Sequence, residues 1–152
     1  MAFTILPLEK LKQCIGEEKK SGWLQITQDR INKFADCTDD HQFIHVDEEL
    51  AKKGPFGTTI AHGFLTLSML TKLSMEDTWM PDGIKAAVNY GFNKVRFVDP
   101  VPSGSKIQDT MVLTNVEEKS GGKVLMTITH TIHVEGKEKP SLVAEWLMMY
   151  LV

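Results

Sequence analysis

The sequence predicts an α+β fold, and two observations carry this prediction. Helical patterns occupy the first half of the 152-residue chain, and long strand patterns occupy the second half. Between them, residues 60–75 (IAHGFLTLSMLTKLSM) place large apolar side chains on nearly every side of a helical wheel, which is typical of a buried helix. We therefore expect a single domain over residues 1–152, in which one central helix packs against a face of an antiparallel sheet.

Capping signals set the helix boundaries in the first half. Pro7 suits the first helical position and Gly16 suits a helix end. Thr27 or Asp29 can cap a later helix, and Asp47 can cap a short one with acidic residues first and lysines last. The expected elements are a helix at 7–15, a strand at 23–27, a helix at 28–37, a polar loop at 38–45, a short helix at 47–53 and the buried helix at 60–75.

The second half contains four strand candidates joined by turns. The last three are separated only by compact Gly-containing turns, so we expect antiparallel neighbours. The final strand (LVAEWLMMYLV) is apolar on both faces, which suggests that the helix covers one face and a partner subunit the other. The four strand candidates are residues 86–98, 105–117, 123–134 and 142–151.

Composition excludes several classes of function. The net charge of −3 leaves no basic excess for binding nucleic acid. Cys14 and Cys37 form no motif, the start MAFTILPLEKL lacks the features of a secretory leader, and the end MMYLV carries no targeting signal. The buried helix is too short and too interrupted by polar residues to span a bilayer. We expect a reduced, cytoplasmic setting with no membrane partner.

The candidate site lies in the polar loop and at the start of the buried helix. Asp40 and His45 offer a carboxylate and an imidazole that can hold a water molecule and perform acid–base chemistry near neutral pH. His62 and Gly63 begin the helix, where free N–H groups stabilise developing negative charge and glycine admits a ligand oxygen. Together these groups predict chemistry on a carbonyl compound through an enolate or a tetrahedral intermediate.

Two other interpretations of these residues stay open. Polar residues before a helix often serve only as caps and turn formers. A metal site built from His41, His45 and His62 is the other alternative, but their spacing matches no familiar ligand pattern, and we expect no metal. His130 and His133 lie three apart on a strand and therefore on opposite faces, so they are not a ligand pair.

The segment FADCTDDHQFIHVDEELAKKGPFGTTIAHGFLTLSML resembles the signature region of the MaoC-like, or hydratase 2, family of (R)-specific enoyl-CoA hydratases. The family pattern Gly-Asp-x-Asn-Pro-x-His falls on residues 39–45. Gln42 and Phe43 are most similar to the nodulation-protein-N-like branch and to PhaJ-type hydratases. The later segment VNYGFNKVRFVDPVPSGS also resembles that branch, so the likeness covers most of the chain.

This resemblance implies a hot-dog fold, in which a curved antiparallel sheet wraps a central helix, usually as a homodimer. It implies reversible syn addition of water to a trans-2-enoyl-CoA, giving an (R)-3-hydroxyacyl-CoA, with no cofactor. Asp40 and His45 would activate the water and move the proton, and the Gly63 N–H would bind the thioester oxygen. The pathways it suggests are fatty acid metabolism and polyhydroxyalkanoate precursor supply.

Further residues follow from the same resemblance. Gln42 and His62 join Gly63 as candidate substrate-binding residues, and Asn89 and Arg96 are candidates for the acyl-CoA channel, together with Lys94. Asp39 stands where the family has glycine, which implies backbone strain if the position needs a positive φ. A hot-dog thioesterase and a non-catalytic acyl-thioester binding or signalling protein are the rival functions, because a shared fold does not fix chemistry.

Overall fold

The computed structural model describes residues 3–152. Residues 1–2, which begin the segment MAFTILPLEKL, lie outside the described residues. All five helices of the described residues lie in the first half of the chain, and the long strands lie in the second, as expected. In order, the elements are β1 (Thr4–Leu6), α1 (Leu8–Gln13), β2 (Glu18–Lys20), β3 (Leu24–Gln25), α2 (Gln28–Thr38), α3 (Phe43–Val46), α4 (Glu48–Lys52), α5 (Gly63–Ser74), β4 (Trp79–Pro81), β5 (Ala86–Phe97), β6 (Lys106–Lys119), β7 (Lys123–Val134) and β8 (Leu142–Leu151).

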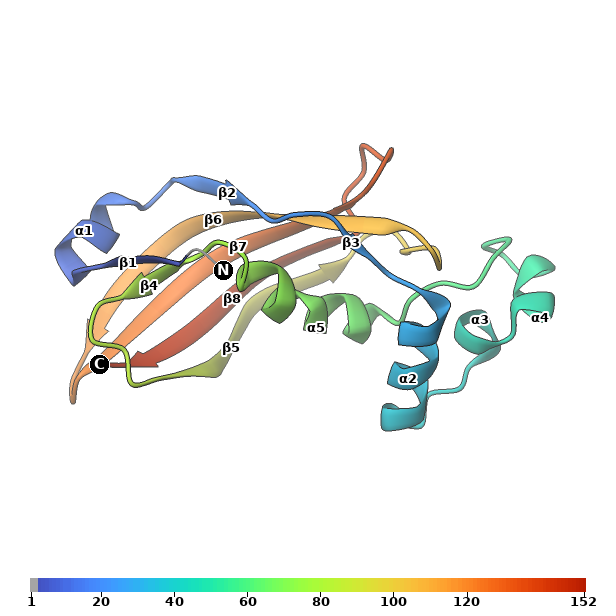
Figure 1. Cartoon of the computed structure of the whole chain (residues 1–152), viewed down its shortest axis with the longest axis horizontal. Helices are drawn as coiled ribbons and strands as arrows, with labels where there is room; N and C mark the ends of the chain where they lie inside the picture. Colours follow the sequence, from blue (N-terminus) through green and yellow to red (C-terminus); the bar gives the residue numbers. More distant parts are fainter. Residues whose placement is uncertain (1–2) are drawn as a thin grey trace.

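The main sheet has the strand order β2-β6-β7-β8-β5. The short strand β3 also pairs with β6, further along that strand than β2 does. Hairpins join β6, β7 and β8 as antiparallel neighbours, which confirms the pairing predicted for the last three strands. β5 crosses over to pair with β8 and forms one edge of the sheet. Figure 1 shows the sheet curving along α5, with α2, α3 and α4 gathered beyond one end of it. This arrangement is the mixed α+β fold that was predicted.

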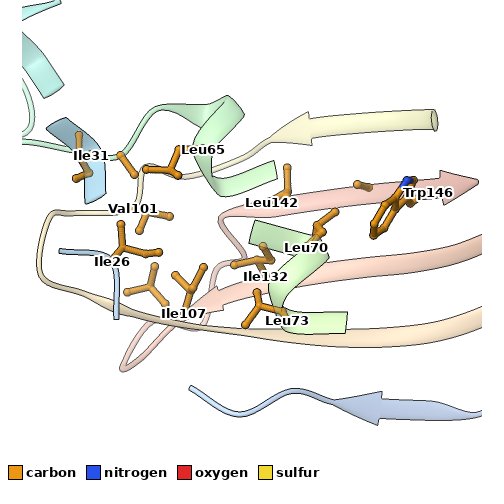
Figure 2. Close-up of a cluster of buried hydrophobic side chains, with 13 residues drawn as sticks. Ile26, Ile31, Leu65, Leu70, Leu73, Val101, Ile107, Ile132, Leu142 and Trp146 are labelled. Atoms are coloured by element: carbon orange, nitrogen blue, oxygen red, sulfur yellow. The ribbon is translucent and has the colours of Figure 1, made fainter. Parts of the chain in front are cut away.

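The core between α5 and the sheet is apolar and closely packed. Leu65, Leu70 and Leu73 of α5 are buried against strand residues that include Ile107 and Ile132 (Figure 2). Alternate residues of each strand face this layer, because successive side chains of a strand point to opposite faces of the sheet. The core therefore fixes the position of α5, and with it the position of the first turn of that helix.

The central helix differs from its prediction in length and in burial. It begins at Gly63 rather than at Ile60, because Ile60 forms a β-bridge with Pro102 and the chain stays extended up to His62. It is also not buried on every side: Phe64 is 69% exposed and Met75 is 48% exposed. The sheet covers one side of α5, so the other side lies open in a single chain.

The capping predictions at Thr27 and Asp47 are confirmed, whereas Pro7 is the N-cap of α1 rather than its first residue, and α1 ends at Gln13, before Gly16. The Thr27 hydroxyl accepts from the Arg30 N–H at the start of α2, and the Asp47 carboxylate accepts from the Leu50 N–H at the start of α4. The hydroxyls of Ser68 and Ser74 donate to carbonyls four residues earlier in α5. All of these bonds join residues three or four positions apart, and for this reason the caps at Thr27 and Asp47 could be predicted from the sequence.

Other local predictions were wrong. The loop expected at 38–45 is partly helical, because α3 contains His45. β1 and β4, which were not predicted, pair in parallel in a separate two-stranded sheet. The strand predicted to be apolar on both faces is β8, which lies inside the main sheet between β7 and β5. Within residues 3–152, no helix combines the length and the hydropathy that crossing a bilayer requires.

Candidate active site

The loop after α2 carries Asp40 next to an unusual backbone conformation. Asp39 ends α2 with φ 57° and ψ 22°, and it is the only non-glycine residue with positive φ among residues 3–152. The structure thus confirms that the position occupied by glycine in the family pattern needs a left-handed conformation. This turn ends the helix and directs the chain into Asp40, whose side chain is 53% exposed.

His45 sits on α3 with one ring nitrogen engaged. Its Nδ1 lies 2.7 Å from the carbonyl oxygen of Ile60, so Nδ1 carries the hydrogen and donates it. Burial lowers the pKa of the His45 imidazole, and the neighbouring His62 ring lowers it further, against the opposing effects of the Ile60 carbonyl and of Asp40. The neutral ring therefore keeps a free lone pair on Nε2 near neutral pH, which is what accepting a proton from water requires.

Gln28 holds the backbone of His45 from the neighbouring helix. Its side-chain Nε2 donates to the His45 carbonyl oxygen at 2.7 Å, and its Oε1 accepts from the Thr59 hydroxyl at 2.6 Å. Gln28 therefore ties α3 to the segment that precedes α5. Its position in the first turn of an ordinary amphipathic helix gave no sign of this role in the sequence.

His62 lies beneath the Asp40 loop and is 3% exposed. Its ring stacks on His45 with centroids 3.8 Å apart and packs against Phe34 at 5.0 Å. Its Nε2 lies 3.0 Å from the Asp40 carbonyl oxygen and donates to it. His62 thus holds the loop in place through the backbone of Asp40, while its Nε2 is 4.0 Å from the nearer carboxylate oxygen of that residue.

Gly63 is the first residue of α5 and borders a cavity of about 220 Å³. The N–H of a first helical residue has no partner within its own helix and lies at the positive end of the helix dipole. The Phe97 ring approaches closely, because a Cβ added at Gly63 would lie 3.0 Å from a Phe97 ring carbon. The cavity is lined by His45, Phe56, Ile60, Ala61, Gly63, Thr66, Phe97, Val98, Asp99, Pro100, Val101 and Ser141.

Ser141 is a cavity residue that sequence reasoning missed. It is 2% exposed, and its hydroxyl oxygen has no hydrogen-bond partner within residues 3–152. Its backbone N–H donates to Ile132 and its carbonyl accepts from Val98, so the residue is fixed at the start of β8. A buried free hydroxyl beside His45 and Gly63 is available to a ligand. No local motif marks this serine, which reaches the site only through the sheet.

The structure brings Asp40, His45, His62 and Gly63 together and leaves the other candidates elsewhere. Gln42 is exposed at the start of α3, with its backbone N–H 3.4 Å from an Asp40 carboxylate oxygen. Three residues of β5 lie outside the cavity lining: Asn89 borders a second cavity, Lys94 is exposed, and Arg96 is exposed and donates to the carbonyl of its own neighbour, Val95.

The metal alternative takes a different form in the structure. His41 is exposed and pairs with Asp36 at 2.9 Å, away from the other two histidines of the predicted set. Asp40, His45 and His62 each place one potential ligand atom, a carboxylate oxygen or a ring nitrogen, within 4.8 Å of the other two. The two rings are nearly parallel, 24° apart, so their in-plane lone pairs run side by side rather than converging on one ion. The donor set therefore fits a metal ion poorly.

Comparison with known proteins agrees with the geometry. The family model "MaoC like domain" matches residues 10–135. The chain belongs to the MaoC-like family. It is 51% identical over 132 residues to 3-hydroxyacyl-thioester dehydratase Z of Mycobacterium tuberculosis, covering 87% of each chain. It is 39% identical over 144 residues to nodulation protein N of Rhizobium leguminosarum bv. viciae, covering 93% of this chain and 89% of that protein.

The fold is also similar to those of solved hydratase and MaoC-like dehydratase structures. The (R)-hydratase from A. caviae involved in PHA biosynthesis matches with a TM-score of 0.71 and 20% identity, over 88% of this chain and 94% of that one. The resemblance drawn from the sequence to the MaoC-like family and to nodulation protein N is confirmed, and the likeness to the PhaJ-type structures confirms the hot-dog fold. As a MaoC-like family member, the protein is a hydratase/dehydratase, a hydro-lyase.

Proposed function

We propose that this chain, as one MaoC-like hot-dog domain over residues 1–152, is an (R)-specific enoyl-CoA hydratase. It would add water reversibly to a trans-2-enoyl-CoA and give an (R)-3-hydroxyacyl-CoA. The observation that carries the proposal is the geometry of His45. Its Nδ1–H is committed to the Ile60 carbonyl, which leaves Nε2 as an acceptor beside the cavity that Gly63 also lines. The likeness of the fold to the (R)-hydratase from A. caviae supports the proposed stereochemistry.

In the proposed mechanism, Asp40 and the Nε2 of His45 hold one water molecule. The water oxygen forms a bond to the β-carbon of the enoyl thioester as one of its protons passes to the Asp40/His45 pair. The electrons of the double bond move onto the thioester oxygen, where the Gly63 N–H and the dipole of α5 stabilise the enolate. The same pair then delivers a proton to the α-carbon on the same face. The sum is the addition of one water, with no cofactor or metal.

The thioester oxygen has a second possible donor in the cavity. The buried Ser141 hydroxyl lacks a partner within the described part of the chain and borders the same space as Gly63. A thioester carbonyl bound there would receive one hydrogen bond from the backbone and one from this side chain. Loss of a single donor of this kind typically costs about 3–4 kcal/mol in the transition state.

One assay separates this function from its rivals. Crotonyl-CoA is incubated with the protein while the conjugated enoyl-thioester absorbance and the free thiol are followed together. We expect absorbance to fall without thiol release. Thiol release would identify a thioesterase, and retained acyl-CoA binding with neither change would identify a non-catalytic binding protein. Comparison of the product with authentic (R)- and (S)-3-hydroxybutyryl-CoA tests the stereochemistry.

We also propose that the protein is a homodimer built on β5. This strand is the edge of the main sheet, and its unpaired backbone groups can pair with another chain. Three large apolar side chains along it are exposed, namely Val88 at 48%, Tyr90 at 63% and Phe92 at 40%. Contiguous exposed apolar surface on an edge strand is typical of an interface. Pairing of β5 with its copy around a two-fold axis would cover both features.

The dimer is tested by measuring mass in solution. Light scattering coupled to gel filtration should give twice the chain mass for the wild type. Val88→Lys should shift the protein towards one chain mass, because a charge on an edge strand opposes pairing. Ile15→Lys is the matched control, since Ile15 is similarly exposed (44%) but lies just after α1, away from β5. An unchanged mass for Val88→Lys would reject β5 as the interface.

A further inference from the structure

A second cavity, of about 290 Å³, lies by the C-terminal half of α5. It is separate from the cavity at His45 in its lining, because the two share no residue. Its walls come from α5, β5, β7 and β8, with further residues near β1 and β4. The lining residues are Phe3, Thr71, Ser74, Met75, Thr78, Met80, Ala87, Asn89, Ile128, His130, Trp146, Met148 and Tyr150.

Three buried polar atoms in this lining have no hydrogen-bond partner within residues 3–152. They are the Thr78 hydroxyl oxygen, the His130 Nε2 and the Trp146 Nε1, in residues that are 4%, 0% and 7% exposed. Nearly all buried polar groups in folded proteins are paired, so three unpaired ones around one space are unusual. Each costs stability while it stays unpaired, and that cost is removed when a ligand supplies the missing bond.

The hydrogen-bonding capacities of these atoms restrict the ligand. The Trp146 Nε1–H can only donate. The His130 Nδ1 lies 2.6 Å from the buried Asp109 carboxylate and donates to it, so in the neutral ring Nε2 is an acceptor. The Thr78 hydroxyl can do either. One ligand hydroxyl group can accept from both Trp146 and Thr78 and donate to His130, and so satisfies all three atoms.

The remaining lining excludes a charged ligand. It contains no lysine, arginine, aspartate or glutamate, so no opposite charge is available to pair with a buried ion. Burial raises the pKa of the Tyr150 phenol in the wall to about 12, which keeps that group neutral too. Asp109 lies behind His130 and would repel a carboxylate or a phosphate. Ile128 and the methionines offer apolar contact to the rest of the ligand.

We propose that this second cavity is a binding site for a neutral, apolar molecule or segment that carries one hydroxyl group. Two sources present this chemistry: a hydroxylated acyl chain attached to a substrate thioester, and a free hydroxylated lipid or aromatic alcohol. Binding itself does not depend on the proposed hydratase activity, and only the identification of the source uses it.

Benzyl alcohol and toluene make a suitable probe pair, because they share a ring and differ by one hydroxyl group. Titration calorimetry on the full-length protein should show benzyl alcohol binding more tightly than toluene. Trp146→Phe and Thr78→Val each remove one unpaired polar group and keep most of its shape. We expect each to weaken benzyl alcohol binding about three- to ten-fold and to leave toluene binding unchanged.

The same two variants separate a ligand site from a structural role. A polar group without a partner contributes no bond to the free protein, so the nearly isosteric Thr78→Val should melt at or above the wild-type temperature. Trp146→Phe also removes packed ring volume from the core and should melt somewhat lower, so its evidence is the binding measurement. Ser141→Ala is the matched control, because it removes an unpaired buried hydroxyl from the other cavity. It should leave benzyl alcohol binding unchanged. Equal affinity for the two probes, or unchanged binding in Trp146→Phe and Thr78→Val, would show that the polar atoms hold only water and would overturn the proposal.

Kinetics then identify the source of the ligand. If benzyl alcohol inhibits turnover of 8-hydroxy-trans-2-octenoyl-CoA but not of crotonyl-CoA, the cavity receives the hydroxylated far end of an acyl chain. If it binds and inhibits neither reaction, the cavity serves a separate molecule. Both results support the site. Absence of hydration activity altogether would reject the proposed function and leave the calorimetric result standing by itself.

Discussion

The imidazole rings of His45 and His62 stack face to face, with 3.8 Å between their centroids and 24° between their planes. Each ring also donates one hydrogen bond to a backbone carbonyl: His45 to Ile60, and His62 to Asp40. The stack and these two bonds therefore fix both the orientation of the His45 ring and the position of the Asp40 loop relative to it. The stack joins His45 to His62, although α4 and a long turn separate the two residues in the chain.

Removing either proposed acid–base group should abolish most of the activity. We expect Asp40→Asn and His45→Gln each to lower kcat for crotonyl-CoA hydration by about 100-fold or more, because general acid–base catalysis contributes 10²–10⁴-fold. Circular dichroism and thermal melting establish that each variant is folded. Asp36→Asn is the matched control and should keep normal turnover, because Asp36 is an exposed carboxylate of α2 that pairs with His41. Near-normal turnover in Asp40→Asn or His45→Gln would remove that residue from the mechanism.

The pH dependence of stability should report the burial of His45. Because burial lowers the pKa of this imidazole in the fold, the unfolded chain binds a proton near pH 6.5 that the folded chain does not. The stability of the wild type relative to His45→Gln should therefore be constant above about pH 7 and fall as the pH drops from there towards the lowered pKa.

Urea unfolding of both proteins between about pH 5 and 8 measures this difference. His41, whose pKa is raised by Asp36, is present in both proteins, so its opposite contribution cancels in the comparison. A difference that is flat with pH, or that grows in favour of the wild type at low pH, would contradict the lowered pKa. Hydratase activity should likewise persist somewhat below pH 6.5, since the free base remains available there.

Asp39→Gly should stabilise the protein. The left-handed conformation at Asp39 costs an L-residue about 1–2 kcal/mol, with aspartate at the lower end, and costs glycine almost nothing. Glycine loses more backbone entropy on folding, so we expect a net gain of about 0.5 kcal/mol in the free energy of unfolding. Asp39→Ala is the comparison and should be less stable than both. Denaturant melts of the three proteins provide the test, and a glycine variant less stable than the wild type would refute the explanation.

Gly63→Ala should impair the site through Phe97. An added Cβ would lie 3.0 Å from one ring carbon and 3.1 Å from the next, closer than ordinary contact, so the ring or the helix start must shift. Displacement of the Gly63 N–H by such a shift should lower kcat about 10- to 100-fold. The double variant Gly63→Ala/Phe97→Ala should recover part of the loss relative to Phe97→Ala alone. Failure of any recovery would place the defect in the glycine backbone rather than in the contact.

The parts of the fold that depend on nearby residues were predictable from the sequence. The caps at Thr27 and Asp47 act over three residues, and the turns between β6, β7 and β8 force antiparallel neighbours. The pairing of β5 with β8 is different, because it brings Ala86 next to Leu151 across a long crossover that no local pattern records. The start of α5 was misplaced for the same reason, since a bridge from Ile60 to the distant Pro102 keeps the chain extended.

The candidate site follows the same division. Asp40, His45 and Gly63 could be named because family spacing and helix-start chemistry are readable along the chain. The stacking of His62 on His45, the bonds of Gln28 and the free hydroxyl of Ser141 could not, because each depends on how distant elements pack. The unpaired polar atoms of the second cavity also come together only in the folded chain. They belong to the connection between α5 and β4, to β7 and to β8, which are separate segments in the sequence.

The backbone of Ile60 contributes more to the site than its aliphatic side chain suggests. Its carbonyl selects which nitrogen of His45 bears the hydrogen, its N–H is bound by Ile44, and its backbone is bridged to Pro102 after β5. The tautomer of the imidazole is thus dictated by a stretch of main chain that is anchored only once the two halves of the molecule have docked. Heating that weakens these contacts lets the ring reorient while most of the sheet is still folded. The protein should therefore lose activity at a lower temperature than the one at which it unfolds.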